Sequence, residues 1–405
     1  MSFDVTPCAD REEFEQAFLS IGQYFGAEPD EERTDQWLEI LPLERMHAAR
    51  EDGAIVGGAG AFPFAMTVPG GEVACAGVTV VGVHPTHRRR GALSSMMRAQ
   101  LDDVRERGEP IAALWASEER IYTRYGYGIA SLTGEVRLLR AHASYGVPFE
   151  ADGRVRIVDA EEAETLVPAV YDQWRRTSPG AFARTDAWWT KRLLPDPPAR
   201  RSGRGPRRWA VVERDGAPVA YAAYRHAPKF EEGVSKATLF AAEVIGVDAS
   251  ALAAAWRYVL DIDWTETVEA YLLPIDHPLF LLLAEPRRMR FRVGDGLWVR
   301  LVDIGAALSQ RSYGADGSVV FEVADAFLPD NAGRWKLDGG SATRTDDEPD
   351  IALDVRDLGS AYLGGFTFAE LQRGRRIREL KGGAVARADA MFRTEDPAPW
   401  CPEIF

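Results

Sequence analysis

The stretch Val78–Ala99, V-T-V-V-G-V-H-P-T-H-R-R-R-G-A-L-S-S-M-M-R-A, decides the fold of this chain. It begins with an apolar, β-branched run that ends at Val83 and predicts a buried strand. A polar turn follows, with arginines and a glycine at Arg88–Gly91. From Leu93 onward, apolar residues recur at helical spacing and predict an amphipathic helix. A strand, a basic glycine turn and a helix present unpaired backbone N–H groups and positive charge, which is how folds bind a diphosphate.

Length and composition limit the class of protein and its number of domains. A chain of 405 residues with 46% hydrophobic and 27% charged residues predicts a globular protein of two or three domains. It has no apolar run long enough to span a membrane and no basic-then-apolar leader, so we expect neither a spanning segment nor secretion. Cys8, Cys75 and Cys401 are few and far apart, which favours free thiols in a reducing cytoplasm over disulfides or a zinc site. We expect no bound metal, and we interpret Cys75 as a core residue.

The formal net charge of −14 is the next constraint. It disfavours binding to nucleic acid and to anionic membranes, and it favours a cationic substrate. An acidic surface can also serve solubility alone, so the net charge does not distinguish a protein that attracts a cationic substrate from one that is merely kept soluble. Neither the Rossmann nor the Walker glycine pattern is present, which excludes those nucleotide-binding motifs.

The pattern along the chain is mixed α/β and repeats itself. Helices are expected over residues 11–22 and 31–40, and residues 132–140 are expected to close the first sheet. Val244–Ser250, followed by a helix over 251–260, matches the type of the strand and turn at Val80–Thr86. The second copy has Leu252–Ala255 in place of the basic glycine turn, so it lacks a diphosphate site if the duplication is real rather than a chance similarity.

These motifs carry a resemblance. Arg88, Gly91 and Leu93 fill the acetyl-coenzyme A motif Arg/Gln-x-x-Gly-x-Gly/Ala of the GNAT superfamily, although Leu93 departs from the usual small residue. The later run A-S-E-E-R-I-Y-T-R-Y-G-Y-G at 116–128 is more specific. With its repeated unit, third region and terminal phenylalanine, the chain resembles the enhanced intracellular survival (Eis) N-acetyltransferases throughout. That family acetylates amines of aminoglycosides and some lysines, and it assembles as hexamers.

The resemblance implies an organisation and a set of site residues. The fold class is mixed α/β (α+β). It has a catalytic GNAT domain over 1–145, a second GNAT-like domain without cofactor over 150–295, and a sterol-carrier-protein-like α+β domain over 296–405. The residues implied in acetyl-coenzyme A binding are Val81, Gly82 and Val83 for the pantetheine arm, Arg88, Arg89, Arg90, Gly91, Ala92, Leu93 and Ser94 for the diphosphate, and Ser117 and Glu118 after the next strand. Tyr122 matches the general acid of the family, and the terminal carboxylate of Phe405 matches its general base.

Elementary chemistry supports both catalytic roles. An alkylammonium has a pKa of about 10 and must lose a proton before it attacks a thioester, so a nearby carboxylate is useful. An α-carboxyl is a weak base, with a pKa of about 3.5, and needs burial or a water relay. A phenol can protonate the departing thiolate. Tyr125 and Tyr127 are rivals of Tyr122 for this role, and Phe405 could instead be an apolar plug.

Acceptor binding calls for carboxylates and aromatic faces. Asp30 and Trp37, together with Glu31 and Glu32, are candidates, as is Glu403 beside the terminus. The leading hypothesis is therefore a cytoplasmic, hexameric acetyltransferase acting on aminoglycoside amines. The alternatives are a lysine acetyltransferase with an open peptide groove, and a protein that binds lipid or acyl-coenzyme A without turnover.

Overall fold

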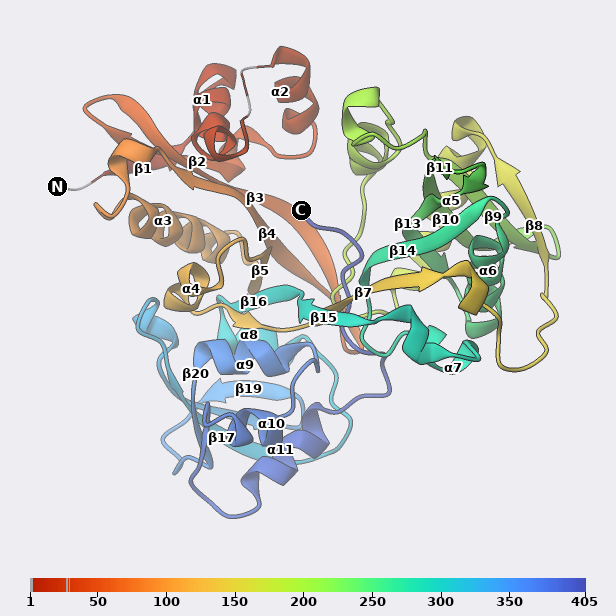
Figure 1. The fold of residues 1–405 in the computed structure, drawn as a ribbon. Helices are drawn as coiled ribbons and strands as arrows, with labels where there is room; N and C mark the ends of the chain where they lie inside the picture. The colour runs from red at the N-terminus through yellow and green to blue at the C-terminus, as the bar shows by residue number, and fades with distance from the viewer. Residues whose placement is uncertain (1–2, 27, 29) are drawn as a thin grey trace. The chain divides into compact units, whose positions relative to one another are not determined.

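The structure, a computed structural model, describes residues 3–26, 28 and 30–405 (Figure 1). Its internal contacts divide the chain into two units, each described here by itself. Unit 1 contains the chain up to Ser131, Leu297–Asp396 and Ile404–Phe405, and unit 2 contains Leu132–Gly296 and Pro397–Glu403.

Unit 1 is built on a sheet whose seven strands lie in the order β1-β2-β3-β4-β5-β16-β6. Four helices accompany it. The strands, in spatial order, are β1 (Asp4–Pro7), β2 (Met46–Glu51), β3 (Ala54–Val68), β4 (Gly71–Val83), β5 (Ile111–Trp115), β16 (Leu297–Leu301) and β6 (Gly128–Ile129). The helices are α1 (Arg11–Gly22), α2 (Glu31–Leu38), α3 (Ala92–Glu106) and α4 (Glu119–Tyr122).

Helix α3 forms as the sequence predicts, because its apolar residues share one face. Met97, Leu101 and Val104 are fully buried in the core that also holds residues of β4 and β5. Met96 belongs to a neighbouring core that includes Phe3. Burying side chains of this size stabilises the fold by about 1.5–3 kcal/mol each. The helix is thereby held against the sheet with its first turn next to the end of β4.

The C-terminal part of unit 1 is a second layer of strands and helices. Its sheet has the order β19-β18-β17-β20-β21. The strands are β17 (Ser318–Ala324), β18 (Gly333–Asp338), β19 (Ser341–Arg344), β20 (Ile351–Asp354) and β21 (Arg378–Glu379). The helices are α8 (Ile304–Ser309), α9 (Val355–Tyr362), α10 (Phe368–Arg373) and α11 (Ala384–Phe392). This confirms the small α+β region expected beyond Leu297.

Unit 2 has a seven-stranded sheet in the order β15-β7-β14-β13-β10-β9-β8. Its core surrounds Trp256, which is fully buried. The strands are β7 (Leu132–Leu139), β8 (Arg154–Val158), β9 (Arg208–Arg214), β10 (Ala217–Ala227), β13 (Ala237–Gly246), β14 (Thr265–Leu273) and β15 (Arg292–Asp295), with a hairpin of β11 (Phe230–Glu231) and β12 (Val234–Ser235). The main helices are α5 (Ala160–Arg175), α6 (Ala249–Asp261) and α7 (Leu279–Leu282).

One prediction about strand pairing is wrong. Residues 132–140 do not close the first sheet, because β7 pairs with β14 and β15 in unit 2. The first sheet is completed instead by β16, which pairs with β5 and β6. The expected domain limits of 1–145, 150–295 and 296–405 assign β7 to the first domain and β16 to the third. In the structure, β7 lies in the sheet of unit 2 and β16 lies in the first sheet. In the described part of the chain, no helix is both long and apolar enough to cross a membrane.

Candidate functional site

Strands β4 and β5 separate beside the basic turn at Arg88–Gly91. Their parallel pairing runs from Cys75↔Ile111 to Gly77↔Ala113. Beyond that point β5 continues in its pairing with β16. On its other side β4 is bulged against β3, and Val80 takes a positive φ of 53°. The stretch Val81–Val83 therefore has a backbone edge that β5 does not cover, and this is the stretch that the family resemblance implies in binding the pantetheine arm.

The first turn of α3 is uncapped and has the features of an anion-binding helix end. Gly91 is its N-cap, with φ 102° and no side-chain cap, and the first helical bond runs from Ser95 N–H to Gly91 O at 3.0 Å. The N–H groups that precede Ser95 have no acceptor within the helix, and the helix dipole adds positive charge there. A Cβ at Gly91 would meet no atom within 4 Å, so the space beside this backbone is open.

The three arginines of the turn differ in their surroundings. Arg90 Nη2 pairs with Glu51 Oε1 at 2.5 Å, and His87 Nε2 lies 3.2 Å from the other oxygen of Glu51. Arg88 lies over the ring of Tyr24, 5.8 Å from its centroid. All three arginines are exposed, and Arg90 ties the turn to β2 through its ion pair with Glu51. Sequence reasoning missed Glu51, since nothing in the local pattern at the end of β2 marks it.

Tyr24 is a second residue that sequence reasoning missed. Its hydroxyl donates to the carbonyl of Val83 at 2.9 Å and so fixes the end of β4. Ser117 and Glu118 are exposed between β5 and α4, as the sequence places them.

Substituting Gly91 by Ala tests the turn. The positive φ at Gly91 costs a residue with a Cβ about 1–2 kcal/mol, and relaxing that strain shifts the backbone that faces the ligand. We expect the Kd of coenzyme A to rise about tenfold. Gly108→Ala, at the other end of α3, is the matched control, because Gly108 also has a positive φ, 73°, and open space around it. Calorimetry that finds the same Kd change in both variants would contradict a diphosphate site at the first turn.

The three candidate tyrosines lie in one apolar cluster with different hydroxyl environments. Tyr127 is fully buried, and its hydroxyl has no hydrogen-bond partner in the described part of the chain. The hydroxyl of Tyr125 lies 3.1 Å from Ser94 Oγ, at the first turn of α3. Tyr122 is 7% exposed, and among the described residues its hydroxyl has no hydrogen-bond partner. Burial, with smaller contributions from Tyr125 and Glu118, raises the pKa of Tyr122 to about 12.

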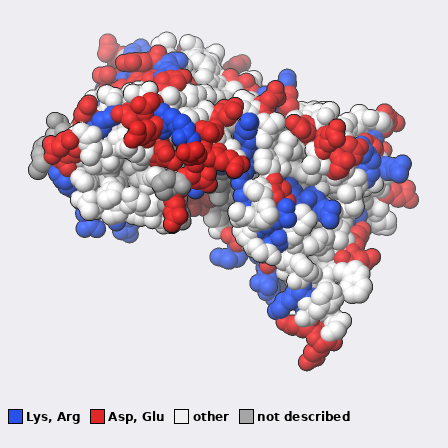
Figure 2. Space-filling view, turned by 90° about the horizontal axis from the view of Figure 1, so that it is seen from above, with Lys and Arg blue, Asp and Glu red and all other residues white. Residues whose placement is uncertain are grey.

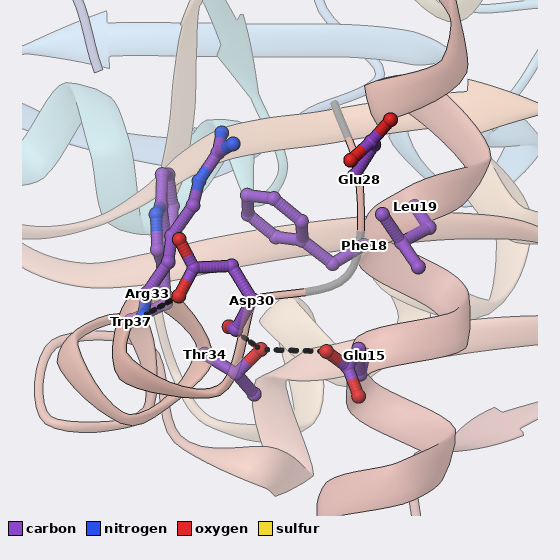
Figure 3. A pocket seen from close by; sticks show the side chains of 8 residues that line it. All are labelled: Glu15, Phe18, Leu19, Glu28, Asp30, Arg33, Thr34 and Trp37. Carbon is purple, nitrogen blue, oxygen red and sulfur yellow. Dashed lines mark hydrogen bonds between the residues drawn. The ribbon is translucent and has the colours of Figure 1, made fainter. Parts of the chain in front are cut away.

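Phe405 ends a row of aromatic rings in unit 1. Its ring contacts Phe64 edge-on, with centroids 4.9 Å apart. The row continues from Phe64 to Phe62 at 5.4 Å and from Phe62 to Trp37 at 5.7 Å. Trp37 also contacts Phe18, which with Asp30 and Trp37 lines one narrow pocket (Figure 3). The alternation F-P-F in β3 was the available signal for this row, since it places Phe62 and Phe64 on one face.

Acidic side chains surround that pocket. Figure 2 shows them gathered over the face that carries α1 and α2. Asp30 caps α2 by accepting the N–H of Arg33 at 3.0 Å, so its carboxylate also has a structural role. The exposed carboxylates here are Glu12, Glu28, Asp30, Glu31, Glu32, Asp35 and Glu39. They give this face of unit 1 the negative field that a polyamine would follow.

Glu403 lies in unit 2 and is held by cations. Its carboxylate is 3.2 Å from Arg184 Nη2 and 2.9 Å from Arg192 Nε, and it accepts the indole N–H of Trp188 at 3.0 Å. The Arg184 side chain is only 1% exposed and also pairs with Glu243. With its charge neutralised in this way, Glu403 anchors the terminal segment, and its proposed contact with the acceptor stays a prediction.

Glu403→Gln tests the anchoring role. The amide keeps the shape of the side chain but loses the charge that faces Arg184 and Arg192. We expect the free energy of unfolding to fall by about 1–3 kcal/mol. Thermal denaturation measures it, with exposed Glu164→Gln on α5 as the control. Equal melting temperatures for the two variants would show that the anchor contributes nothing.

Unit 2 repeats the strand–helix arrangement without the open helix end. β13 and β14 pair in parallel from Ala237↔Thr265 to Ala241↔Ala270, and α6 follows β13. Here the N-cap is Asp248, whose carboxylate accepts the N–H of Ala251 at 2.8 Å and pairs with Arg214. The Asp248 carboxylate occupies a backbone N–H group that a phosphate would bind, and its negative charge offsets the positive end of the helix dipole.

Comparisons with known proteins agree with this architecture. Residues 8–130 and 180–301 each match a family model described as an acetyltransferase (GNAT) domain, and residues 304–402 match a sterol carrier protein domain. The exchanged strand β16 falls within the second GNAT match, whereas β7 lies outside both.

Relatives match over the whole length. The chain is 44% identical to an uncharacterized N-acetyltransferase of Streptomyces avermitilis, covering 94% of this chain and 93% of that protein. It is 33% identical to the N-acetyltransferase Eis of Mycobacterium tuberculosis, covering 97% and 98%. The crystal structure of Eis1 from Mycobacterium abscessus superposes with a TM-score of 0.86 at 34% identity, covering 99% and 100%. The chain therefore belongs to the Eis family of GNAT N-acetyltransferases.

Proposed function

We propose that this N-acetyltransferase moves an acetyl group from acetyl-coenzyme A directly to a primary amine of a cationic small molecule, with aminoglycosides as the expected acceptors. The observation that carries the cofactor site is the uncapped first turn of α3 beside the uncovered edge of β4. A GNAT fold implies the use of acetyl-coenzyme A, and the donors present fit it: backbone N–H groups at 92–94, with Arg88 and Arg89 exposed beside them.

The proposed mechanism divides its proton transfers between two residues. Acetyl-coenzyme A supplies the acetyl group as a thioester. The terminal carboxylate of Phe405 accepts the proton that the acceptor ammonium must lose, directly or through water. The amine nitrogen then bonds to the carbonyl carbon while the carbon–sulfur bond breaks, and Tyr122 gives its phenolic proton to the departing sulfur. The acylated nitrogen loses its remaining surplus proton to the Tyr122 phenolate, directly or through water, which restores the phenol. With its pKa raised to about 12 by burial, Tyr122 carries its proton at neutral pH, as a general acid must, and the same shift makes it a weaker acid.

The acidic face over α1 and α2 supports a polycationic acceptor. Of the seven exposed carboxylates, Asp35 pairs with Arg11 at 2.9 Å. The other six can attract several ammonium groups at once, and Trp37 offers an aromatic surface beside them. A lysine side chain carries only one ammonium and would use little of this field. The hexamer remains a prediction from the family, and the cytoplasmic location remains a prediction from the few, scattered cysteines.

A thiol-release assay tests the proposal. Purified full-length protein is given acetyl-coenzyme A and, in separate reactions, aminoglycosides, linear polyamines or lysine peptides. We expect the highest kcat/KM with aminoglycosides. Peptides as the best acceptors would favour a lysine acetyltransferase. Coenzyme A binding without thiol release from any acceptor would favour the carrier-like alternative, which the sterol carrier protein match of residues 304–402 suggests.

A further inference from the structure

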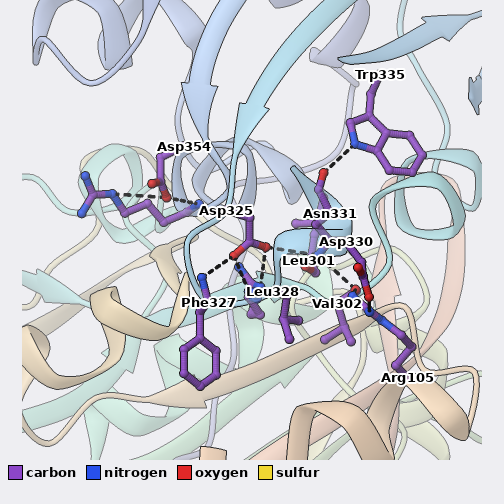
Figure 4. Close-up of polar contacts among 12 residues, drawn as sticks. Arg105, Leu301, Val302, Asp325, Phe327, Leu328, Asp330, Asn331, Trp335 and Asp354 are labelled. Atoms are coloured by element: carbon purple, nitrogen blue, oxygen red, sulfur yellow. Dashed lines mark hydrogen bonds and ion pairs between the residues drawn. The ribbon is translucent and has the colours of Figure 1, made fainter. Parts of the chain in front are cut away.

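The segment Asp325–Asn331, which we call the brace segment, follows β17 in the C-terminal part of unit 1. Figure 4 shows its side chains beside Leu301, Val302 and Arg105. Its aromatic residue, Phe327, contacts the ring of Tyr125 edge-on, with centroids 4.8 Å apart. On α3 the guanidinium of Arg98 lies 4.2 Å from the centroid of the same Phe327 ring. Phe327 therefore packs on the two elements that flank the proposed diphosphate site.

Tyr125 extends this contact to the first turn of α3. Its hydroxyl lies 3.1 Å from Ser94 Oγ, and Ser94 is one of the residues proposed to face the diphosphate. Tyr125 is only 2% exposed, so its ring has little freedom to move unless a neighbour moves first. Contacts thus run without a gap from Phe327 through Tyr125 to Ser94.

A buried ion pair fixes the brace segment itself. Asp325 Oδ2 lies 2.5 Å from Arg300 Nη2, and both side chains are at most 1% exposed. The other oxygen, Oδ1, accepts the N–H groups of Phe327 at 3.1 Å and Leu328 at 2.9 Å. Because Asp325 binds the backbone of Phe327 directly, the position of that ring follows from the ion pair.

The far end of the brace segment is tied to β16 and α3. Asn331 Nδ2 donates to the carbonyls of Leu301 at 3.2 Å and Val302 at 3.1 Å. Near the end of α3, Arg105 donates to the Val302 carbonyl at 3.0 Å and pairs with Asp330 at 3.4 Å. The segment is held at both ends, with Phe327 between them.

We propose that Phe327 is a positioning residue for the acetyl-coenzyme A site: by packing on Tyr125 and Arg98 it holds the Tyr125 hydroxyl on Ser94 and so sets the first turn of α3. The C-terminal part would then serve the acetyltransferase through its brace segment. This inference rests on the proposed function, because it assumes that the first turn of α3 binds the diphosphate.

Calorimetry with coenzyme A, without acceptor, tests the proposal on the full-length chain. Phe327→Ala is expected to raise the Kd about tenfold, since the Tyr125 ring loses its neighbour. Phe327→Tyr keeps the ring and is expected to bind within about twofold of the parent. Leu371→Ala removes a buried side chain from α10 of the same C-terminal part, so it reports the effect of destabilisation alone. Its Kd is expected to match that of the parent.

A double-mutant cycle tests whether Phe327 affects coenzyme A binding through the Tyr125 hydroxyl. Tyr125→Phe keeps the ring but removes the bond to Ser94, so it should weaken binding by itself. If Phe327 acts through that hydroxyl, Phe327→Ala adds less than about twofold in the Tyr125→Phe background.

Three results would overturn the proposal: an unchanged Kd in Phe327→Ala, an equal loss in Leu371→Ala, or full additivity in the cycle. A parent chain that itself binds no coenzyme A would instead refute the proposed function.

Discussion

Tyr122→Phe is expected to lower kcat about 10²–10³-fold while the Kd of coenzyme A stays within about twofold of the parent. The substitution removes one hydroxyl and leaves the ring in its apolar cluster. That hydroxyl has no hydrogen-bond partner among the described residues, so little stability is lost with it. Stopped-flow or steady-state thiol release, together with calorimetry, separates the two quantities.

The neighbouring tyrosines provide matched controls. Tyr127→Phe removes a buried hydroxyl that has no hydrogen-bond partner within residues 3–26, 28 and 30–405, so kcat should stay near the parent value and stability should not fall. Tyr125→Phe should change coenzyme A affinity more than kcat. If Tyr122→Phe turned over at the parent rate, or if Tyr127→Phe were the slow variant, the general acid would be wrongly assigned.

Two glycines added after Phe405 should lower kcat by about 10²-fold or more. The addition turns the terminal carboxylate into an amide, which cannot accept the acceptor's proton, and moves the new carboxylate away from the Phe405 position. The ring of Phe405 can keep its contact with Phe64, so the fold should be little affected. Rates and melting temperatures of the extended and parent chains measure both effects.

The controls for this extension separate the carboxylate from the side chain. The same two glycines added at the N-terminus should leave kcat unchanged. Phe405→Leu keeps the carboxylate and should retain more activity than the extended chain. Full activity in the extended chain would exclude the terminal carboxylate as the base, and Phe405 would then be an apolar plug.

Much of the candidate site could be predicted because its signals are local. The run from Val78 to Ala99 encodes a strand, a turn and a helix by spacing alone, and α3 indeed begins at Ala92 and ends at Glu106. Gly91 stands out in the sequence because glycine is the residue type that takes a positive φ at little cost. The loss of the second site was also visible locally, since Leu252–Ala255 carries neither glycine nor charge.

The rest depends on pairings distant in sequence. β7 and β16 are both short strands of alternating or continuous apolar residues, and neither pattern says which sheet it joins. Glu403 looked like an acceptor ligand because it lies beside the terminus, but its partners Arg184 and Arg192 are more than two hundred residues away. Likewise, nothing around Phe327 points to Tyr125. Such contacts become visible only once the chain is folded.

The most direct test of the central claim compares coenzyme A with pantetheine, which lacks the diphosphate, by calorimetry on the parent chain. If the first turn of α3 binds the diphosphate, coenzyme A binds and pantetheine binds at least about a hundredfold more weakly, because the charge-assisted bonds are lost. Equal affinities for the two ligands, or no heat with coenzyme A, would contradict the account.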